Sequence, residues 1–197
     1  MRIEAGEHKG RKLLGPRGHR TRPITSRAKA VLFDLLGPAV AGAAVVDLFA
    51  GTGSLGLEAL SRGARRCAFA ERDRVALERL GRNIASMNLA DRCEVWAGDL
   101  FAHLRRCLAA LGEPVDLAFV DPPYEMAAAW RWDEAAAKLF GPLGRHLGDE
   151  GTVVFRCRRN IRVPEALGPL CVRRRRDCGR MSLVLLAPLA SPLPAPG

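Results

Sequence analysis

The 197-residue sequence lacks the cysteine spacing of a disulfide framework or a zinc site. It contains no CxxC pair and no Cys/His cluster. Most of its six cysteines lie in or beside apolar, strand-like segments, so we interpret them as small buried hydrophobes in a reducing compartment. We therefore expect a cytoplasmic protein without a metal site. The cysteines stand at positions 67, 93, 107, 157, 171 and 178.

Long hydrophobic runs are also missing. No apolar stretch approaches the roughly 20 residues of a membrane-spanning helix, and residues 1–14 are charged rather than forming the apolar core of a signal peptide. We expect no membrane partner. The length is that of one domain with at most a small appendage.

Acidic residues are scarce at both ends of the chain. The net charge is +10, and residues 1–36 carry nine Lys or Arg against three acids, while residues 151–197 carry nine against two. The segment between them is mildly acidic. Basic ends around an acidic middle are typical of a protein that binds a polyanion such as nucleic acid.

A glycine-rich loop follows a predicted buried strand at 44–49. Gly51, Gly53 and Gly56 form a GxGxxG pattern that opens a predicted helix, and Glu71 lies 20 residues after Gly51. This spacing matches a dinucleotide-binding fingerprint, so a nicotinamide-dependent oxidoreductase is one reading. A methyltransferase that uses S-adenosylmethionine is the other.

Two carboxylates favour S-adenosylmethionine. Asp47, inside the strand, would repel a pyrophosphate in the loop and suit a ligand with an ammonium and a sulfonium group. Asp99 follows a third predicted strand, where it can accept a hydrogen bond from an adenine amine. The alternative for Asp99 is an N-cap of the helix that follows it, and the two roles are compatible.

The segment Asp121-Pro122-Pro123-Tyr124 follows the apolar run 115–120. The prolines end the strand, which leaves a carboxylate and an aromatic ring at its carboxyl end, where α/β sheets bind ligands. Tyr124 can stack on a planar base, while Asp121 and the Pro122 carbonyl can accept hydrogen bonds from its amine. The alternative is a strand-ending turn with an incidental acid.

Strands alternate with helices through most of the chain. Strands are predicted near 44–49, 67–71, 93–97, 115–120 and 151–156, and helices near 54–62, 73–87, 100–110 and 126–147. Two more strands, 170–176 and 181–187, form a hairpin. The expected fold is Rossmann-like α/β, a mostly parallel seven-stranded sheet closed by a C-terminal antiparallel hairpin. We expect three parts: a basic extension over 1–38, the sheet domain over 39–188, and a disordered Pro-rich tail over 189–197. The extension is expected to contain a β-hairpin and a helix that Ser26 caps and that ends near Leu36.

The chain resembles bacterial methyltransferases of the RsmD type, which modify the exocyclic N2 of a guanine in 16S ribosomal RNA. The resemblance covers residues 1–187 and rests on six segments: Gly10–Leu13, Thr21–Pro23, Arg27–Phe33, Asp47–Gly53, Glu58–Ala64 and Asp121–Tyr124. The chain departs from the family at Ile24 and Ser26, which replace a threonine and an aspartate usual there.

The resemblance implies the residue roles. It implies a catalytic set of Asp121, Pro122 and Tyr124, and an S-adenosylmethionine site made by Asp47, Phe49, Gly51, Gly53, Glu71, Asp99 and Leu100. The candidates for RNA contacts are Arg11, Lys12, Arg20, Arg22 and Arg27. The implied partner is 16S RNA or the assembling small ribosomal subunit, bound by a monomer.

Other functions stay open at this point. The Asp-Pro-Pro-Tyr segment also fits an amino-methyltransferase for DNA adenine or another RNA, and a non-catalytic RNA-binding relative is a further alternative. In the run Arg173–Arg176, alternate side chains of a strand point to opposite faces, so two arginines are expected to face RNA. A charged edge strand that resists aggregation explains the same run.

Overall fold

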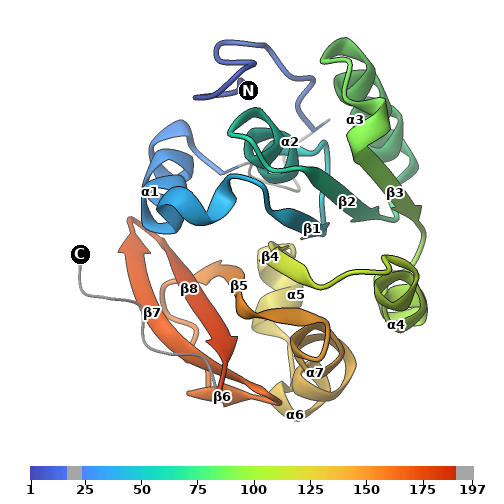
Figure 1. Cartoon of the computed structure of the whole chain (residues 1–197). Coiled ribbons are helices and arrows are strands. Elements are labelled where there is room, and N and C mark those ends of the chain that lie inside the picture. The colour runs from blue at the N-terminus through green and yellow to red at the C-terminus, as the bar shows by residue number, and fades with distance from the viewer. Residues whose placement is uncertain (17–23, 190–197) are drawn as a thin grey trace. The chain divides into compact units, whose positions relative to one another are not determined.

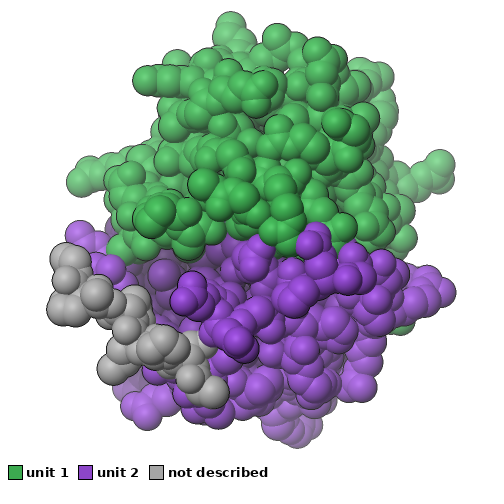
Figure 2. All heavy atoms as spheres, viewed as in Figure 1, with its two compact units in different colours: residues 1–102 green, residues 103–197 purple. Residues whose placement is uncertain are grey.

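The computed structural model describes residues 1–16 and 24–189. The chain forms two compact units, residues 1–102 and residues 103–197 (Figure 2). The predicted division at residues 38 and 188 stays a prediction. The predicted tail falls almost wholly outside the described residues.

The first unit contains three parallel strands in the order β3-β2-β1 (Figure 1). They are β1 (Ala44–Leu48), β2 (Arg66–Glu71) and β3 (Cys93–Ala97). The helices α2 (Ser54–Ser61) and α3 (Arg74–Ser86) connect them, η2 (Ala90–Arg92) precedes β3, and α4 (Leu100–Ala110) follows it. Every residue of β1 is buried, as expected of a strand covered on both faces.

Helix α1 (Ser26–Leu36) ends at Leu36 as predicted, but the predicted N-cap, Ser26, is wrong because Ser26 is the first residue of the helix. Thr25 is the N-cap and its Oγ1 accepts the Ala28 N–H, because its extended backbone turns the hydroxyl onto the first turn. Gly37 ends the helix with a φ of 52°, and η1 (Gly37–Val40) follows. The predicted N-terminal hairpin is present as one antiparallel bridge, Arg2 to Lys12.

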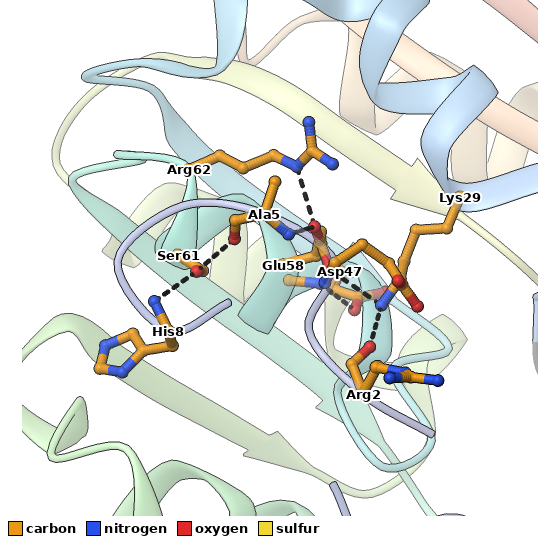
Figure 3. Close-up of polar contacts among 10 residues, drawn as sticks. Arg2, Ala5, His8, Lys29, Asp47, Glu58, Ser61 and Arg62 are labelled. Carbon is orange, nitrogen blue, oxygen red and sulfur yellow. Dashed lines mark hydrogen bonds and ion pairs between the residues drawn. The ribbon is translucent and has the colours of Figure 1, made fainter. Parts of the chain in front are cut away.

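A buried carboxylate anchors the N-terminal segment to α2 (Figure 3). Glu58 is 0% exposed and accepts the backbone N–H groups of Glu4 and Ala5. Its oxygens also lie 2.8 Å from Lys29 Nζ and 2.9 Å from Arg62 Nε. Three elements therefore converge on one charge, since the segment, α1 and α2 each contribute a partner.

The second unit has strands in the order β4-β5-β8-β7-β6. Strand β4 (Val115–Val120) pairs in parallel with β5 (Leu147–Arg158), while β8 (Met181–Pro188), β7 (Leu170–Cys178) and β6 (Ala166–Leu167) add antiparallel pairs. The predicted hairpin is confirmed. The sequence missed only the two-residue β6, so eight strands replace the predicted seven in the described part of the chain.

The single helix predicted over 126–147 is wrong. The structure has four short pieces there: α5 (Tyr124–Ala128), α6 (Trp132–Ala135), the π-helical η3 (Ala136–Phe140) and α7 (Gly141–Gly144). The interruption after α5 lets both tryptophans reach one ring, because residues two apart on a continuous helix face apart. Trp130 stacks on Phe155 with 5.5 Å between centroids, and Trp132 meets the same ring edge-on at 6.1 Å.

Candidate functional site: a glycine loop and an acceptor turn

The loop after β1 needs its glycines. Gly51 and Gly53 have φ values of 57° and 85°, and Phe49 adopts 84°, a strained value for a residue with a side chain. A Cβ on Gly53 would come within 2.6 Å of Leu80 Cδ1. The loop therefore turns sharply between β1 and α2, as the glycine pattern predicts.

Glu71 at the end of β2 reaches back to this loop. Its Oε2 accepts the Gly51 N–H at 2.7 Å, and its Oε1 accepts the N–H groups of Arg72 and Asp73. A dinucleotide pyrophosphate needs the backbone N–H groups of such a loop and no carboxylate beside them. The Gly51 N–H is already satisfied by an anion, which disfavours a pyrophosphate there.

The Asp47 carboxylate accepts a backbone N–H group of the helix that follows the loop. It is 2% exposed and its Oδ2 accepts the Gly56 N–H at 3.0 Å, in the first turn of α2. Its negative charge also acts with burial to raise the pKa of the neighbouring Cys67. The carboxylates of Asp47 and Glu71 thus accept backbone N–H groups at and just after the glycine loop. Two negative charges there suit a ligand with cationic groups and hydroxyls.

Asp99 caps α4, as its alternative reading predicts. Its side chain is exposed and Oδ1 accepts the Phe101 N–H at 2.9 Å. The Phe101 ring is 40% exposed and lies 6.3 Å from the Phe49 ring. The sequence analysis did not predict a role for Phe101, although this aromatic residue directly follows Asp99 and Leu100, the residues assigned to the adenine. The pair Phe49–Phe101 offers apolar surface next to the Asp99 carboxylate.

The predicted acceptor turn lies directly after β4. Pro122 is buried, and Tyr124 begins the short helix α5. The carboxylate of Asp121 is held by an arginine from β5: Arg156 Nε lies 2.5 Å from Asp121 Oδ1. Burial raises the pKa of the Asp121 carboxyl above its ordinary value, and the guanidinium of Arg156 opposes that rise.

Two arginines flank the Tyr124 ring. The guanidinium carbons of Arg156 and Arg158 lie 5.4 Å and 5.5 Å from the ring centroid, within cation–π range. Arg158 also pairs with Glu125 at 2.9 Å. Sequence reasoning did not single out Arg156 or Arg158, because each lies in or at the end of an apolar strand and meets partners more than 30 residues away.

Three of the five predicted RNA contacts lie within the described residues. Arg11 and Lys12 line a hollow of about 600 Å³, together with Arg82 from α3 and Asn83. The Arg11 guanidinium donates to the Ser86 carbonyl, and Arg27 is exposed on the first turn of α1. Arg20 and Arg22 lie outside the described residues.

The structure also bears on the expectations for metal binding, membrane spans and cysteines. Within residues 1–16 and 24–189 no group of three or more acidic, His or Cys side chains is placed to hold a metal ion, and no helix is long and apolar enough to cross a membrane. All six cysteines are free. Burial raises the pKa of Cys93 to about 12 and that of Cys157 to about 11, so these thiols stay protonated at neutral pH.

Comparison with known proteins places the chain in one family. The model of the family described as conserved hypothetical protein 95 matches residues 1–187. "Putative rRNA methyltransferase YlbH" of Bacillus subtilis is 32% identical over 91% of this chain and 94% of its own length. Ribosomal RNA small subunit methyltransferase D of Escherichia coli K12 is 38% identical over 63% of this chain and 60% of its own length.

Solved structures agree. The chain is similar to "Putative methyltransferase yhhF" from Escherichia coli, with a TM-score of 0.78, 30% identity and coverage of 97% of this chain and 99% of that one. A structure described as SMU.776, a putative methyltransferase complexed with SAH, has a TM-score of 0.65 at 13% identity, covering 83% and 50%, and shows the fold alone. The predicted Rossmann-like methyltransferase fold is confirmed, and the chain belongs to the conserved hypothetical protein 95 family, as the RsmD-type resemblance predicts.

Proposed function

We propose that this protein transfers a methyl group from S-adenosylmethionine to the exocyclic N2 amine of a guanine in 16S ribosomal RNA. Family membership and the rRNA methyltransferase names of its relatives support the reaction class. The observation that carries the proposal is the acceptor turn, where Asp121, held by Arg156, precedes the Tyr124 ring. A hydrogen-bond acceptor for the exocyclic amine and an aromatic ring for stacking are the two features needed to bind a nucleobase.

The glycine loop fits S-adenosylmethionine better than a dinucleotide. Its carboxylates Asp47 and Glu71 occupy the N–H groups that a pyrophosphate would need. The Glu71 carboxylate has further lone pairs that can accept hydrogen bonds from ribose hydroxyls, and the Asp99 carboxylate can accept one from the adenine amine. The rings of Phe49 and Phe101 offer apolar contact to the adenine ring. Gly51, Gly53 and Leu100 complete the proposed set. When bound, S-adenosylmethionine supplies a methyl group made electrophilic by its sulfonium.

Asp121 and Tyr124 would prepare the nucleophile. The lone pair of the guanine N2 amine is delocalised into the ring, which makes it a weak nucleophile. Hydrogen bonds from the amine to the Asp121 carboxylate and the Pro122 carbonyl would direct the remaining lone pair away from the ring plane. The carboxylate would also stabilise the positive charge that develops on nitrogen as the N–C bond forms. Stacking on Tyr124 is worth about 1–3 kcal/mol for a nucleobase.

The base has to leave its stack to reach this turn. Basic residues of the N-terminal part, Arg11, Lys12 and Arg27 with Arg20 and Arg22, would hold the surrounding phosphates. We place the reaction in the cytoplasm, carried out by a monomer on 16S RNA or on the assembling small subunit.

A methyl-transfer assay with radiolabelled S-adenosylmethionine tests the proposal. The acceptors are naked 16S RNA, small-subunit particles and duplex DNA, the RNA being taken from cells without this protein. Label in either RNA acceptor and none in DNA is the expected result. Label in DNA alone, or no label while S-adenosylhomocysteine still binds by calorimetry, would overturn it.

A further inference from the structure

The arginine run of β7 is divided between two faces of the sheet. Arg173 donates to the carbonyls of Pro188 and Leu189, and Arg175 donates to those of Ile161 and Arg159 as well as to Ser182 Oγ. These two arginines hold neighbouring backbone in place. The side chains of Arg174 and Arg176 have neither a hydrogen bond nor an ion pair to any described residue, and both residues are exposed.

The strand register assigns these exposed arginines to one face. Arg174 is paired with Leu185, which is paired with Val154, and Arg176 is paired with Leu183, which is paired with Arg156. Residues directly opposite each other in antiparallel strands point to the same side. Arg176 and Arg156 therefore lie on the same face, two strands or about 10 Å apart.

Arg158 joins this face at the acceptor end. It is paired with Met181 and is two residues from Arg156, so its side chain lies on the same side of β5. Its guanidinium is half exposed and contacts both Glu125 and the Tyr124 ring. On this face Arg158 of β5 lies beside Tyr124, Arg174 and Arg176 lie on β7, and β8 between them contributes the apolar Met181, Leu183 and Leu185. We call Arg158, Arg174 and Arg176 the arginine face.

The opposite face of the same strands is unlike it. Phe155 there is packed against Trp130 and Phe140, and Arg175, which donates to Ser182 Oγ of β8, is paired with Asp177 at 3.3 Å. On these strands, the two arginine side chains that have no hydrogen bond or ion pair to a described residue, Arg174 and Arg176, therefore lie on the side that also holds the acceptor turn. If the arginines only protected an edge strand from aggregation, they would not need to lie on the face of the acceptor turn.

We propose that the arginine face binds the phosphate backbone of the RNA next to the nucleotide held at Tyr124, with Arg174 and Arg176 as direct phosphate contacts. The proposal rests on the proposed function for the identity of the polyanion. Arginine suits this role because its planar guanidinium pairs with phosphate through two parallel hydrogen bonds. It adds a second RNA contact surface to the N-terminal residues predicted from the sequence.

The test compares two charge-matched double variants of the full chain. R174E/R176E changes the arginine face. R105E/R106E changes two exposed arginines of α4 whose side chains have no hydrogen bond or ion pair to a described residue. Binding of a fluorescently labelled single-stranded 16S RNA fragment is measured by anisotropy at several salt concentrations. Methyl transfer to the same RNA is measured in parallel, and melting curves verify the fold. The single variants R174Q and R176Q serve if the double variant is unstable.

We expect R174E/R176E to raise the Kd by about tenfold at moderate salt and to reduce the slope of log K against log salt by about 1.4, since each phosphate contact to a single strand contributes about 0.7. The KM for RNA rises and kcat at saturating RNA is retained. An unchanged slope, or an equal effect of R105E/R106E, would overturn the proposal. Absence of methyl transfer by the wild type would instead contradict the proposed function, because the binding measurement stands without it.

Discussion

Arg156, a residue only 8% exposed, holds the Asp121 carboxylate through its Nε at 2.5 Å, and its guanidinium also faces the Tyr124 ring. One residue of β5 thus contacts both functional groups of the acceptor turn. A buried arginine is stabilised by such a pair only while its partner stays ionised. The same contact that orients Asp121 therefore also keeps it able to accept hydrogen bonds.

Asp121→Asn is expected to remove most of the methyl transfer. An amide carries no charge to stabilise the developing ammonium, and losses of this kind are about 10²–10³-fold in kcat. Affinity for S-adenosylhomocysteine is expected to stay unchanged, because the residues proposed to bind it lie between Asp47 and Phe101. Single-turnover kinetics and calorimetry measure the two effects. Wild-type kcat in this variant would remove Asp121 from the mechanism.

Arg156→Gln is expected to move the acid limb of the pH–kcat profile to higher pH. Burial raises the Asp121 pKa and Arg156 lowers it, so removal of the guanidinium leaves the raising effect unopposed. Asp121 then becomes protonated, and activity is lost, at a higher pH than in the wild type. Arg158→Gln is the matched control, since Arg158 contacts Tyr124 but forms its ion pair with Glu125. A limb that stays in place in Arg156→Gln, or shifts equally in both variants, contradicts the assigned role.

Glu58→Gln is expected to destabilise the protein by about 3–5 kcal/mol, the usual cost of leaving a buried charge without its partner. Lys29 is 1% exposed and lies 2.8 Å from the carboxylate that the substitution removes. Urea unfolding measures the change. Glu78→Gln is the control, because its pair with Arg82 is exposed on α3 and contributes less than about 1 kcal/mol. Equal effects of the two substitutions would show that the buried network does not anchor the N-terminal segment.

Gly53→Ala is expected to weaken both the fold and cofactor binding. A left-handed φ of 85° costs a residue with a Cβ about 1–3 kcal/mol, and the new methyl group would displace Leu80. Gly81→Ala is the opposite case, because Gly81 lies inside α3 with open space around it, so alanine there stabilises by about 0.4–1 kcal/mol. Thermal melting with and without S-adenosylhomocysteine separates the two effects. Unchanged melting of Gly53→Ala would contradict the tight turn.

Local patterns in the sequence predicted much of this fold. The apolar run 115–120 gave the bounds of β4, and the spacing of apolar residues gave the end of α1 at Leu36. Strand β5 starts at Leu147 instead of residue 151, because Gly148 and Gly151 resemble a turn although the chain there pairs with β4. The helix predicted over 126–147 is interrupted after Ala128, where the sequence has no proline to signal a break. Further on, a π-helical turn precedes Pro142, which has no N–H to donate within a regular helix.

The acceptor turn was predictable as a set of residues but not as an arrangement. Asp121 and Tyr124 adjoin in the sequence, and the prolines fix their place after a strand. Arg156 lies 35 residues further on, inside the apolar run of β5, and only the parallel pairing of β4 with β5 brings it to Asp121. The contact between Phe49, which follows β1, and Phe101, in the first turn of α4, likewise joins residues that are 52 positions apart in the sequence.

The most direct test of the central claim is the identity of the methylated nucleoside. 16S RNA labelled by the protein with radiolabelled S-adenosylmethionine is digested to nucleosides and separated by chromatography against standards. The account predicts that the label elutes with N2-methylguanosine, and that Asp121→Asn slows the growth of this peak by about 10²–10³-fold. Label in N6-methyladenosine or in a ring-methylated or ribose-methylated nucleoside would contradict it, because Asp121 and Tyr124 are assigned to a guanine exocyclic amine.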